Sequence, residues 1–128
     1  MSQGLNMTII CADPSPISLI RLEQSIRKIL PSSSVRLCKQ SECAIREAKK
    51  RGCDVLITEI DFGRRKGEGI ELANKILDLF PFANVIFATA APDRDYAPLI
   101  MRMKYSGYLT KPFEIEDLEK EFNNLRHC

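Results

Sequence analysis

The sequence predicts an α/β fold in which five βα units build one parallel sheet with helices on both faces. Two observations lead to this prediction. Strand-like apolar runs alternate with helical patterns five times along the 128 residues, and this alternation is typical of βα units. The central runs, such as DVLIT and NVIFA, are almost continuously apolar, as expected of parallel strands that are covered on both faces.

The five strands are expected near residues 7–11, 34–38, 54–59, 84–89 and 107–110. Each run is short, rich in β-branched or other apolar residues, and bounded by polar or turn-forming residues. Cys11 and Cys38 fall inside two of the runs, where a cysteine usually packs as a small hydrophobic residue. We therefore expect both thiols to lie in the core.

The first two helices carry start and stop signals. The first is expected to begin with Ser15 as its N-cap and Pro16 in its first position, and to end before Pro31. The second is expected at 41–51 and stops at Gly52. Apolar residues at helical spacing predict the buried faces: Leu19, Leu22, Ile26 and Ile29 in the first helix, and Ala44, Ile45 and Ala48 in the second.

Two further helices follow the third and fifth strands. Their predicted buried residues are Ile70, Ala73, Ile76, Leu77 and Phe80 before Pro81 in the third helix, and Ile115, Leu118, Phe122 and Leu125 in the fifth. The remaining residues of the fifth helix are largely charged, so its outer face should be solvated.

The fourth helix is less regular, because Pro98 lies in the segment where it should form. A proline costs about 3 kcal/mol inside a helix and little in its first turn. We therefore expect this helix to begin near Ala97 and to run to about Lys104, after a loop at 90–96.

Length and composition fit one domain spanning 1–128, with 1–6 as a flexible N-terminus. Apolar residues make up 45% of the chain and charged residues 28%, which is ordinary for a soluble globular domain. The net charge of +2 is too small to point to nucleic acid or an anionic membrane as a partner. No apolar run approaches the ~18 residues of a membrane-spanning helix.

The cysteine content indicates the redox compartment of the protein, and the histidine content limits the kinds of catalysis it could perform. Five scattered cysteines without a C-x-x-C motif fit a reducing cytoplasm better than a disulfide framework. His127 is the only histidine and lies beside Cys128 in the tail. We expect no metal site there, and histidine catalysis elsewhere is excluded.

Polar residues follow four of the predicted strands at the point where each strand ends. They are Asp13, Glu59, Thr89 and the pair Lys111-Pro112. Since the carboxyl ends of parallel strands lie along one edge of the sheet, these residues are expected to converge there despite their distance in sequence. The expected site combines two acids, a hydroxyl and an ammonium group.

The segments that carry these residues are IICADPSP, CDVLITEI, VIFATA and SGYLTKPF. Together with the spacing between Glu59, Thr89 and Lys111, they resemble the receiver domain of bacterial two-component response regulators over nearly the whole chain. The resemblance implies a flavodoxin-like (βα)5 fold with strand order 2-1-3-4-5. In that family, acids after the first strand bind Mg²⁺ and an aspartate after the third accepts a phosphoryl group. The positions matched by Thr89 and Lys111 then read the phosphorylated state.

Two positions depart from the family's pattern. Glu59 stands where the resemblance places the phosphoacceptor aspartate, and Pro14 follows Asp13 where a second acid is usual. Glutamate is one methylene longer, and a displacement of about 1 Å at a reacting atom can lower a rate about a hundredfold. Pro14 supplies no ligand, and Mg²⁺ is held by few protein groups. We therefore expect no enzyme activity. The one cofactor considered is Mg²⁺, and its site at Asp13 and Glu59 is expected to be weak or absent.

What remains is a charge arrangement that needs neither metal nor phosphate, in which Glu59 is expected within salt-bridge reach of Lys111. Three interpretations stay open. Glu59 imitates the phosphorylated state and recruits Thr89 by a hydrogen bond, or it is an inert partner of Lys111, or some phosphorylation persists at Glu59 or at Asp61, two positions further along.

The loop that follows, IDFGRRKGEG, is unusually basic. Three interpretations of Arg64, Arg65 and Lys66 stay open. They belong to a solvated loop, they supply positive charge to Glu59 and Asp61, or they form a docking point for an acidic partner.

The expected contact surface is made by the fourth helix, the fifth strand and the fifth helix. A protein partner, an output domain or a second copy of the chain would bind there, and a sensor kinase is a further candidate partner. Tyr108 takes the place of the family's aromatic switch residue, or it simply packs at the sheet edge. Met101 and Met103 lie about 200° apart around a helix axis, so at least one should be exposed.

An unrelated small enzyme is the remaining alternative, but the sequence has no G-x-G-x-x-G or Walker-type loop.

Overall fold

The computed structural model describes residues 6–90 and 93–125. Most of the segment 1–6, together with His127 and Cys128, lies outside this part of the chain. The strands are β1 (Thr8–Ala12), β2 (Ser34–Cys38), β3 (Val55–Thr58), β4 (Asn84–Thr89) and β5 (Gly107–Thr110). They form one parallel sheet in the order β2-β1-β3-β4-β5, which confirms the predicted topology.

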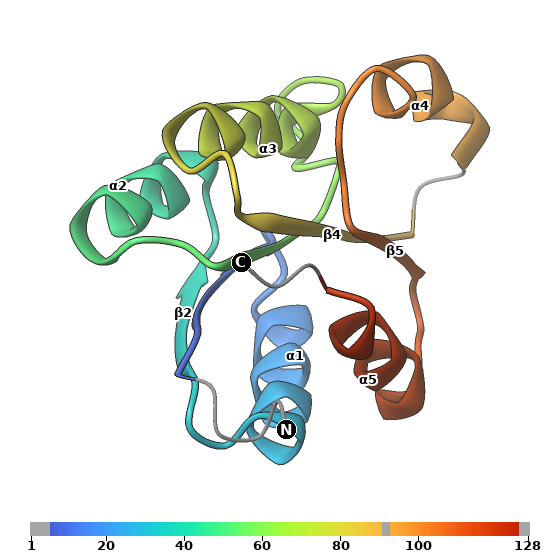
Figure 1. Cartoon of the computed structure of the whole chain (residues 1–128). Helices are drawn as coiled ribbons and strands as arrows, with labels where there is room; N and C mark the ends of the chain where they lie inside the picture. The colour runs from blue at the N-terminus through green and yellow to red at the C-terminus, as the bar shows by residue number, and fades with distance from the viewer. Residues whose placement is uncertain (1–5, 91–92, 126–128) are drawn as a thin grey trace.

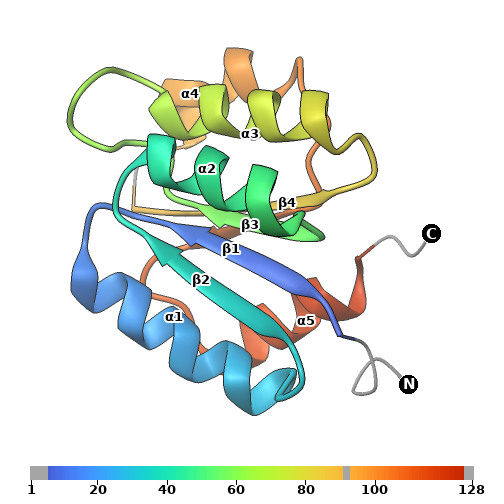
Figure 2. The same ribbon diagram turned by 90° about the vertical axis from the view of Figure 1, so that its left-hand side faces the viewer.

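Helices cover both faces of this sheet. They are α1 (Pro16–Ile29), α2 (Ser41–Arg51), α3 (Glu68–Leu79), α4 (Asp93–Ile100) and α5 (Ile115–Asn123). Figures 1 and 2 show α1 and α5 on one face and α2, α3 and α4 on the other. β1 begins and α5 ends at one edge of the sheet, and β1 leads into α1 at the opposite edge (Figure 2). Across the described residues, no helix has both the length and the apolar character needed to cross a membrane.

The two faces of the sheet bury separate cores. In β3, Val55 and Ile57 pack in the layer that also holds α1 and α5 residues, whereas Leu56 packs with α2, α3 and α4 residues. This alternation follows from the two-residue period of a strand. Cys11 and Cys38 are buried in these layers as expected, and burial raises the pKa of the Cys11 thiol far above its usual range. Both cysteines therefore act as small core residues.

The helix ends agree with the start and stop signals. The Ser15 side chain accepts a hydrogen bond from the backbone N–H of Ser18 at 3.2 Å, and α1 begins at Pro16. At the end of α2, the N–H of Gly52 donates to the carbonyl of Ala48 at 2.7 Å. Gly52 has φ +84°, a left-handed conformation that glycine adopts without steric cost.

Burial of the other helices departs slightly from the prediction. Ile70, Ala73 and Ile76 of α3 are buried, but Leu77 and Phe80 are only partly buried and pack against the core. In the fifth helical region Leu118, Phe122 and Leu125 are buried, and Ile115 is half-buried.

The predicted fourth helix is wrong in its position. α4 runs from Asp93 to Ile100 and contains Pro98 in its interior, so it begins about four residues earlier and ends about four residues earlier than expected. The helix continues past the proline, since the N–H of Met101 donates to the carbonyl of Ala97 at 2.9 Å. Tyr96 and Ile100 lie one turn apart and are both buried in the core. Their packing outweighs the cost of a proline in the helix.

α3 approaches the end of β3 unusually closely. The N–H of Gly69 donates to the carbonyl of Ile60 at 2.8 Å. A Cβ atom on Gly69 would lie 1.8 Å from the carbonyl oxygen of Glu59. Only a glycine therefore fits here, and this contact fixes how closely the start of α3 packs against the segment that carries Glu59.

Candidate functional site

Three charged side chains meet at the carboxyl edge of the sheet, and we call Asp13, Glu59 and Lys111 the charged triad. The Lys111 ammonium donates to Oε1 of Glu59 at 3.0 Å and also to Oδ2 of Asp13. The expected salt bridge between Glu59 and Lys111 is confirmed. Asp13 and Glu59 are only 5% and 8% exposed, so one ammonium group is shared by two nearly buried carboxylates.

The backbone fixes the position of each member of the charged triad. The N–H of Asp13 donates to Cys38, that of Glu59 to Ala12, and that of Lys111 to Thr89, each at 2.9 Å to the carbonyl oxygen. These bonds extend the parallel ladders by one residue beyond the strands. The three side chains are therefore held by neighbouring strands and not by mobile loops.

The second oxygen of Glu59 is also used. Its Oε2 accepts hydrogen bonds from the backbone N–H groups of Ile60 at 2.7 Å and Asp61 at 3.2 Å. Oδ1 of Asp13 accepts from the N–H of Ser15 at 2.9 Å. Each carboxylate oxygen of the charged triad thus has a donor supplied by the protein itself.

The carboxylates also hold Lys111 in its charged form. Partial burial alone lowers the pKa of Lys111, but the hydrogen bonds to Asp13 and Glu59 outweigh it, so the pKa is raised above its ordinary 10.5. Lys111 is therefore an ammonium group throughout the neutral range.

These residues fit a bound Mg²⁺ poorly. A hard cation needs free oxygen ligands, and both carboxylates already bind an ammonium group. Pro14 offers no oxygen from its side chain. Among the described residues no group of three or more His, Cys, Asp or Glu side chains is placed to hold a metal ion.

The other predicted site residues lie around the charged triad. Thr89 is buried, and its carbonyl accepts from the Lys111 N–H; a bond from its hydroxyl to Glu59 stays a prediction. The peptide bond between Lys111 and Pro112 is cis. Tyr108 is half-buried and packs against the core beside α4, so its role as a switch also stays a prediction.

Asp61 is placed differently from Glu59. β3 ends at Thr58, so the strand does not carry Asp61 onto the same side as Glu59. The Asp61 side chain is exposed, and its Oδ1 accepts a hydrogen bond from the N–H of Gly63 at 2.9 Å. Asp61 contacts Glu59 through its backbone N–H, which donates to Oε2 of Glu59.

The two arginines of the basic loop pair with acids outside the charged triad. Arg65 pairs with Glu71 at 2.9 Å, and the ammonium of Lys66 lies 5.8 Å from the ring centre of Tyr96. Arg64 pairs with Glu42 at 2.9 Å and with Glu68. The idea that the arginines of this loop are counter-ions of Glu59 and Asp61 is therefore wrong, because acids of α2 and α3 bind them instead.

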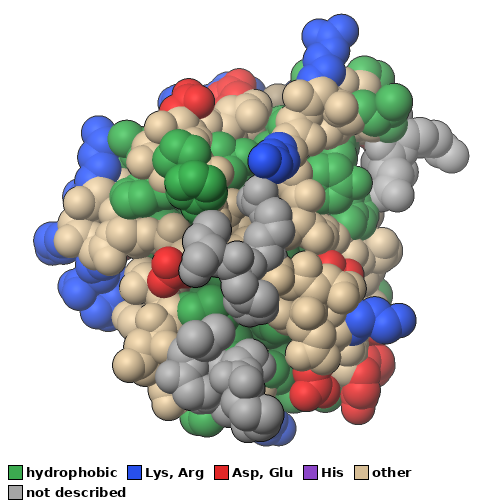
Figure 3. All heavy atoms as spheres, in the orientation of Figure 1, with side chains coloured by type: hydrophobic (Ala, Val, Ile, Leu, Met, Phe, Trp, Pro, Cys, Tyr) green, Lys and Arg blue, Asp and Glu red, His purple; other side chains and the backbone are tan. Residues whose placement is uncertain are grey.

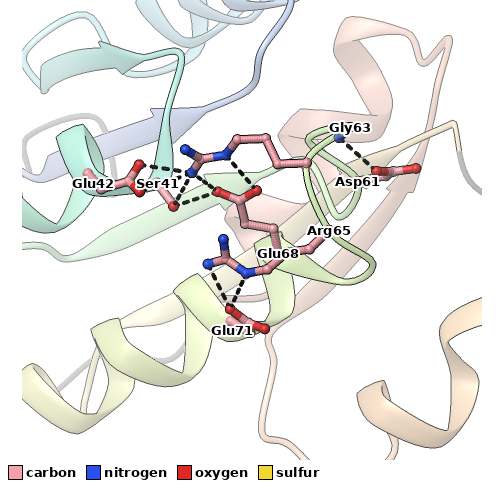
Figure 4. Close-up of polar contacts among 8 residues, drawn as sticks. Ser41, Glu42, Asp61, Gly63, Arg65, Glu68 and Glu71 are labelled. Atoms are coloured by element: carbon pink, nitrogen blue, oxygen red, sulfur yellow. Dashed lines mark hydrogen bonds and ion pairs between the residues drawn. The ribbon is translucent and has the colours of Figure 1, made fainter.

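Arg64 belongs to a cluster that joins the loop to two helices, and we call Ser41, Glu42, Arg64 and Glu68 the Arg64 network. Ser41, Glu42 and Glu68 converge in Figure 4. The Ser41 hydroxyl donates to Oε2 of Glu68 at 2.7 Å, and Glu68 is fully buried. The bonds from Arg64 outweigh this burial and lower the pKa of Glu68. The network clamps the loop after Glu59 onto α2 and α3.

A pocket of about 380 Å³ opens beside the charged triad, and we call it the α1 pocket. Its lining comes from α1, from the ends of β1, β3 and β4, and from the start of the β5–α5 connection: Ala12, Asp13, Ser18, Arg21, Leu22, Ser25, Ile57, Thr58, Glu59, Ala88, Ala90, Lys111, Pro112 and Phe113. The sequence analysis missed the α1 side of this pocket. The signal was present, since Ser18, Arg21, Leu22 and Ser25 share one helix face at spacings of three and four.

Comparison with known families gives a match over most of the chain. The family model of the response regulator receiver domain matches residues 9–123. The transcriptional regulatory protein RcsB of Salmonella typhi is 29% identical over 122 residues, which cover 94% of this chain and 56% of RcsB. RcsB of Escherichia coli K12 is 28% identical with the same coverage. The chain thus spans little more than half the length of these curated relatives.

Solved receiver domains share the fold. The isolated receiver domain of RcsB from Salmonella enterica serovar Typhimurium, solved in the presence of the phosphomimetic BeF₃⁻, superposes with a TM-score of 0.77 at 28% identity, covering 91% of this chain and 85% of that one. The chemotaxis protein CheY4 of Vibrio cholerae gives a TM-score of 0.83 at 17% identity, covering 95% of this chain and 100% of that one. The second likeness concerns the fold alone.

Proposed function

The chain belongs to the response regulator receiver domain family, and on that premise we propose that it is an atypical cytoplasmic receiver. In this proposal it acts in two-component signalling through protein–protein contacts and outside the usual cycle of phosphorylation. The coarser statement, a receiver domain of two-component signalling, rests on the family match. The finer one rests on the charged triad.

The observation that carries the proposal is the occupancy of Glu59. Its carboxylate takes one hydrogen bond from Lys111 and two from the backbone N–H groups of Ile60 and Asp61. A nucleophilic carboxylate attacks through a lone pair that points at the phosphoryl donor. Here N–H groups of the protein already donate hydrogen bonds to both carboxylate oxygens of Glu59. In addition, Pro14 stands where the family usually has a second acidic ligand for Mg²⁺. Each change lowers reactivity, and the two act together.

The same contacts favour the interpretation that Glu59 imitates a phosphorylated receiver. A phosphoryl group on a shorter aspartate would carry its oxygens further from the strand, and its natural donors would be the nearby ammonium and backbone N–H groups. The longer Glu59 side chain presents carboxylate oxygens to donors of this kind. Glu59→Ala should then change NMR chemical shifts at Tyr108 and in α4, whereas an inert partner of Lys111 would change them only around the charged triad.

Direct phosphorylation tests the main proposal. The protein is incubated with acetyl phosphate and Mg²⁺, and its intact mass is measured. We expect no phosphoryl adduct on the wild-type chain. The Glu59→Asp, Pro14→Asp double variant is the matched control that should acquire one. An adduct on wild-type protein that maps to Asp61 or Glu59 would favour the alternative, a receiver that is still phosphorylated.

The proposed contact surface is the face made by α4, β5 and α5. Met101 is 83% exposed, and Leu99 and Tyr105 are 45% and 42% exposed, while Met103 packs against the core. Met101 is exposed as expected, but α4 ends at Ile100, so neither methionine lies on the helix from which that expectation was derived. In Figure 3, hydrophobic and cationic side chains lie close together over the α4 part of this face, and acidic side chains lie over the α5 part. Flexible methionine and rigid tyrosine suit a protein contact, so an output domain, a second copy or a sensor kinase are the candidate partners.

A further inference from the structure

The α1 pocket has the size and lining of a small-molecule site. Its volume of about 380 Å³ lies within the range of about 300–1,000 Å³ that is usual for ligand pockets. Leu22, Ile57, Ala88 and Phe113 provide apolar walls. Such a lining favours a ligand with an apolar body, because displacing water from these walls is favourable.

The polar groups of the α1 pocket divide into two sets. The charged triad and Thr58 form one set, and their hydrogen bonds are largely used within the protein, that of the Thr58 hydroxyl being donated to the carbonyl of Glu59 at 2.8 Å. Ser18, Arg21 and Ser25 form the other set on α1. Within the described part of the chain, none of these three side chains makes a hydrogen bond or an ion pair. Their donors are therefore available to a ligand.

Charge limits what this second set can bind. Asp13 and Glu59 carry two negative charges in the pocket lining, and Lys111 and Arg21 carry two positive ones, so the lining is neutral as a whole. A multiply charged anion such as phosphate would gain from Arg21 and lose from the two nearby carboxylates. A single carboxylate held at Arg21, on the α1 side, gains a planar two-bonded partner without entering the acidic part of the pocket.

We propose that the α1 pocket binds a small organic monocarboxylate with an apolar body. Arg21 holds the carboxylate together with the hydroxyl of Ser25, one turn further along α1, and the body lies against Leu22 and Phe113. This inference goes beyond the signalling proposal and stands whether or not that proposal holds. It makes the occupancy of the space beside the charged triad depend on the concentration of a small carboxylate.

Titration of the ¹⁵N-labelled protein tests the proposal. Hexanoate and phenylacetate are the probes, hexanamide is the neutral control, and inorganic phosphate is the control for charge alone. We expect saturable amide shifts along α1 between Ser18 and Ser25 and at Phe113, with dissociation constants of about 1 mM or below. Hexanamide and phosphate should bind at least about tenfold more weakly than hexanoate.

Two variants and one matched control locate the binding. Arg21→Gln should weaken hexanoate binding at least about tenfold, and Ser25→Leu, which fills the pocket from the helix surface, should do the same. Arg27→Gln is the control, since Arg27 is an exposed arginine of the same helix that pairs with Glu23 at 2.9 Å; it should leave binding unchanged. The amide spectrum of each variant checks that it is folded.

Several results would overturn the proposal. They are the absence of saturable shifts with either carboxylate up to about 10 mM, equal binding of hexanamide, tighter binding of phosphate than of hexanoate, or unchanged binding in folded Arg21→Gln. Each would remove the role given to Arg21 or the apolar walls.

Discussion

Lys111 compensates two carboxylates that have little access to water, so its removal has a specific cost. In Lys111→Met, Asp13 and Glu59 are left close together without a cation. Breaking a buried ion pair by removing one partner costs about 3 kcal/mol or more, and because Lys111 is partly exposed we expect about 2–3 kcal/mol. Urea unfolding at neutral pH measures this change. The control is Lys49→Met on the exposed face of α2, which should change stability by less than about 0.5 kcal/mol; a loss no larger in Lys111→Met would contradict the account of the charged triad.

Restoration of phosphorylation separates the roles of Glu59 and Pro14. Glu59→Asp alone should yield little adduct from acetyl phosphate, because Pro14 still denies Mg²⁺ a ligand. The same change combined with Pro14→Asp should yield clearly more, in a manner that depends on Mg²⁺. Intact mass with and without EDTA measures both. Full Mg²⁺-dependent labelling of the single variant would show that Pro14 matters less than we propose.

At the scale of elements, the contact between α3 and the end of β3 leaves no space for a side chain. In Gly69→Ala the new Cβ would lie 1.8 Å from the carbonyl oxygen of Glu59, and the Glu59 backbone is held by the bond from its N–H to the carbonyl of Ala12. We expect a loss of more than about 3 kcal/mol or failure to fold, measured by thermal and urea unfolding. Gly63→Ala is the contrast: its φ is +84° but nothing lies within 4 Å of the new Cβ, so it should cost only about 1 kcal/mol. Similar losses in the two variants would contradict this packing argument.

The Arg64 network makes stability depend on acid pH. Its bonds from Arg64 lower the pKa of Glu68 below its ordinary 4.5, so Glu68 stabilises the folded state fully above pH 4.5 and loses this contribution as the pH falls through its folded pKa. Glu68→Gln should therefore be less stable than wild type near neutral pH, and the difference should shrink as the pH falls below 4.5. Urea unfolding of both proteins across this range is the measurement. A difference that stays constant from neutral pH down to the acid-unfolding transition would mean that the Glu68 charge has no such role.

At the scale of the whole molecule, charge on the α4, β5 and α5 face should govern association. Arg102 and Lys104 are exposed and stand beside Met101 and Tyr105. Arg102→Glu or Lys104→Glu should weaken self-association or partner binding several-fold, while the thermal midpoint changes little, because exposed charges contribute little to stability. Analytical ultracentrifugation and calorimetric melting measure the two effects. If both variants associate normally while changes at Ile17 or Ile20 on α1 abolish association, the interface lies on the α1 side instead.

Much of this architecture could be predicted from the sequence. The strands agree within a residue or two, because buried parallel strands are apolar runs with polar residues at their carboxyl ends. The salt bridge between Glu59 and Lys111 could also be predicted, since both follow strands that end at one edge. The strand order, by contrast, followed from the resemblance to a family and not from the apolar pattern.

Features that depend on tertiary packing could not be predicted in this way. α4 begins earlier than expected because Tyr96 and Ile100 are buried together, and their burial outweighs the local cost of Pro98. The Arg64 network escaped notice because Ser41 and Glu68 are 27 positions apart and share no periodic pattern. Arg21 and Ser25 lie beside the apolar stripe of α1 in sequence, and only the three-dimensional arrangement places them in a pocket lining.

The positions of the first strand and the last helix have a practical consequence for handling the protein. β1 begins and α5 ends at the edge of the sheet opposite to the charged triad (Figure 2). A biotin tag, a fluorescent protein or a sensor-chip linker joined at either end would therefore leave the carboxyl edge facing solution. Immobilised protein should keep its α1 pocket and its charged triad open to soluble molecules. Protein attached at either end should therefore serve for surface-based binding measurements.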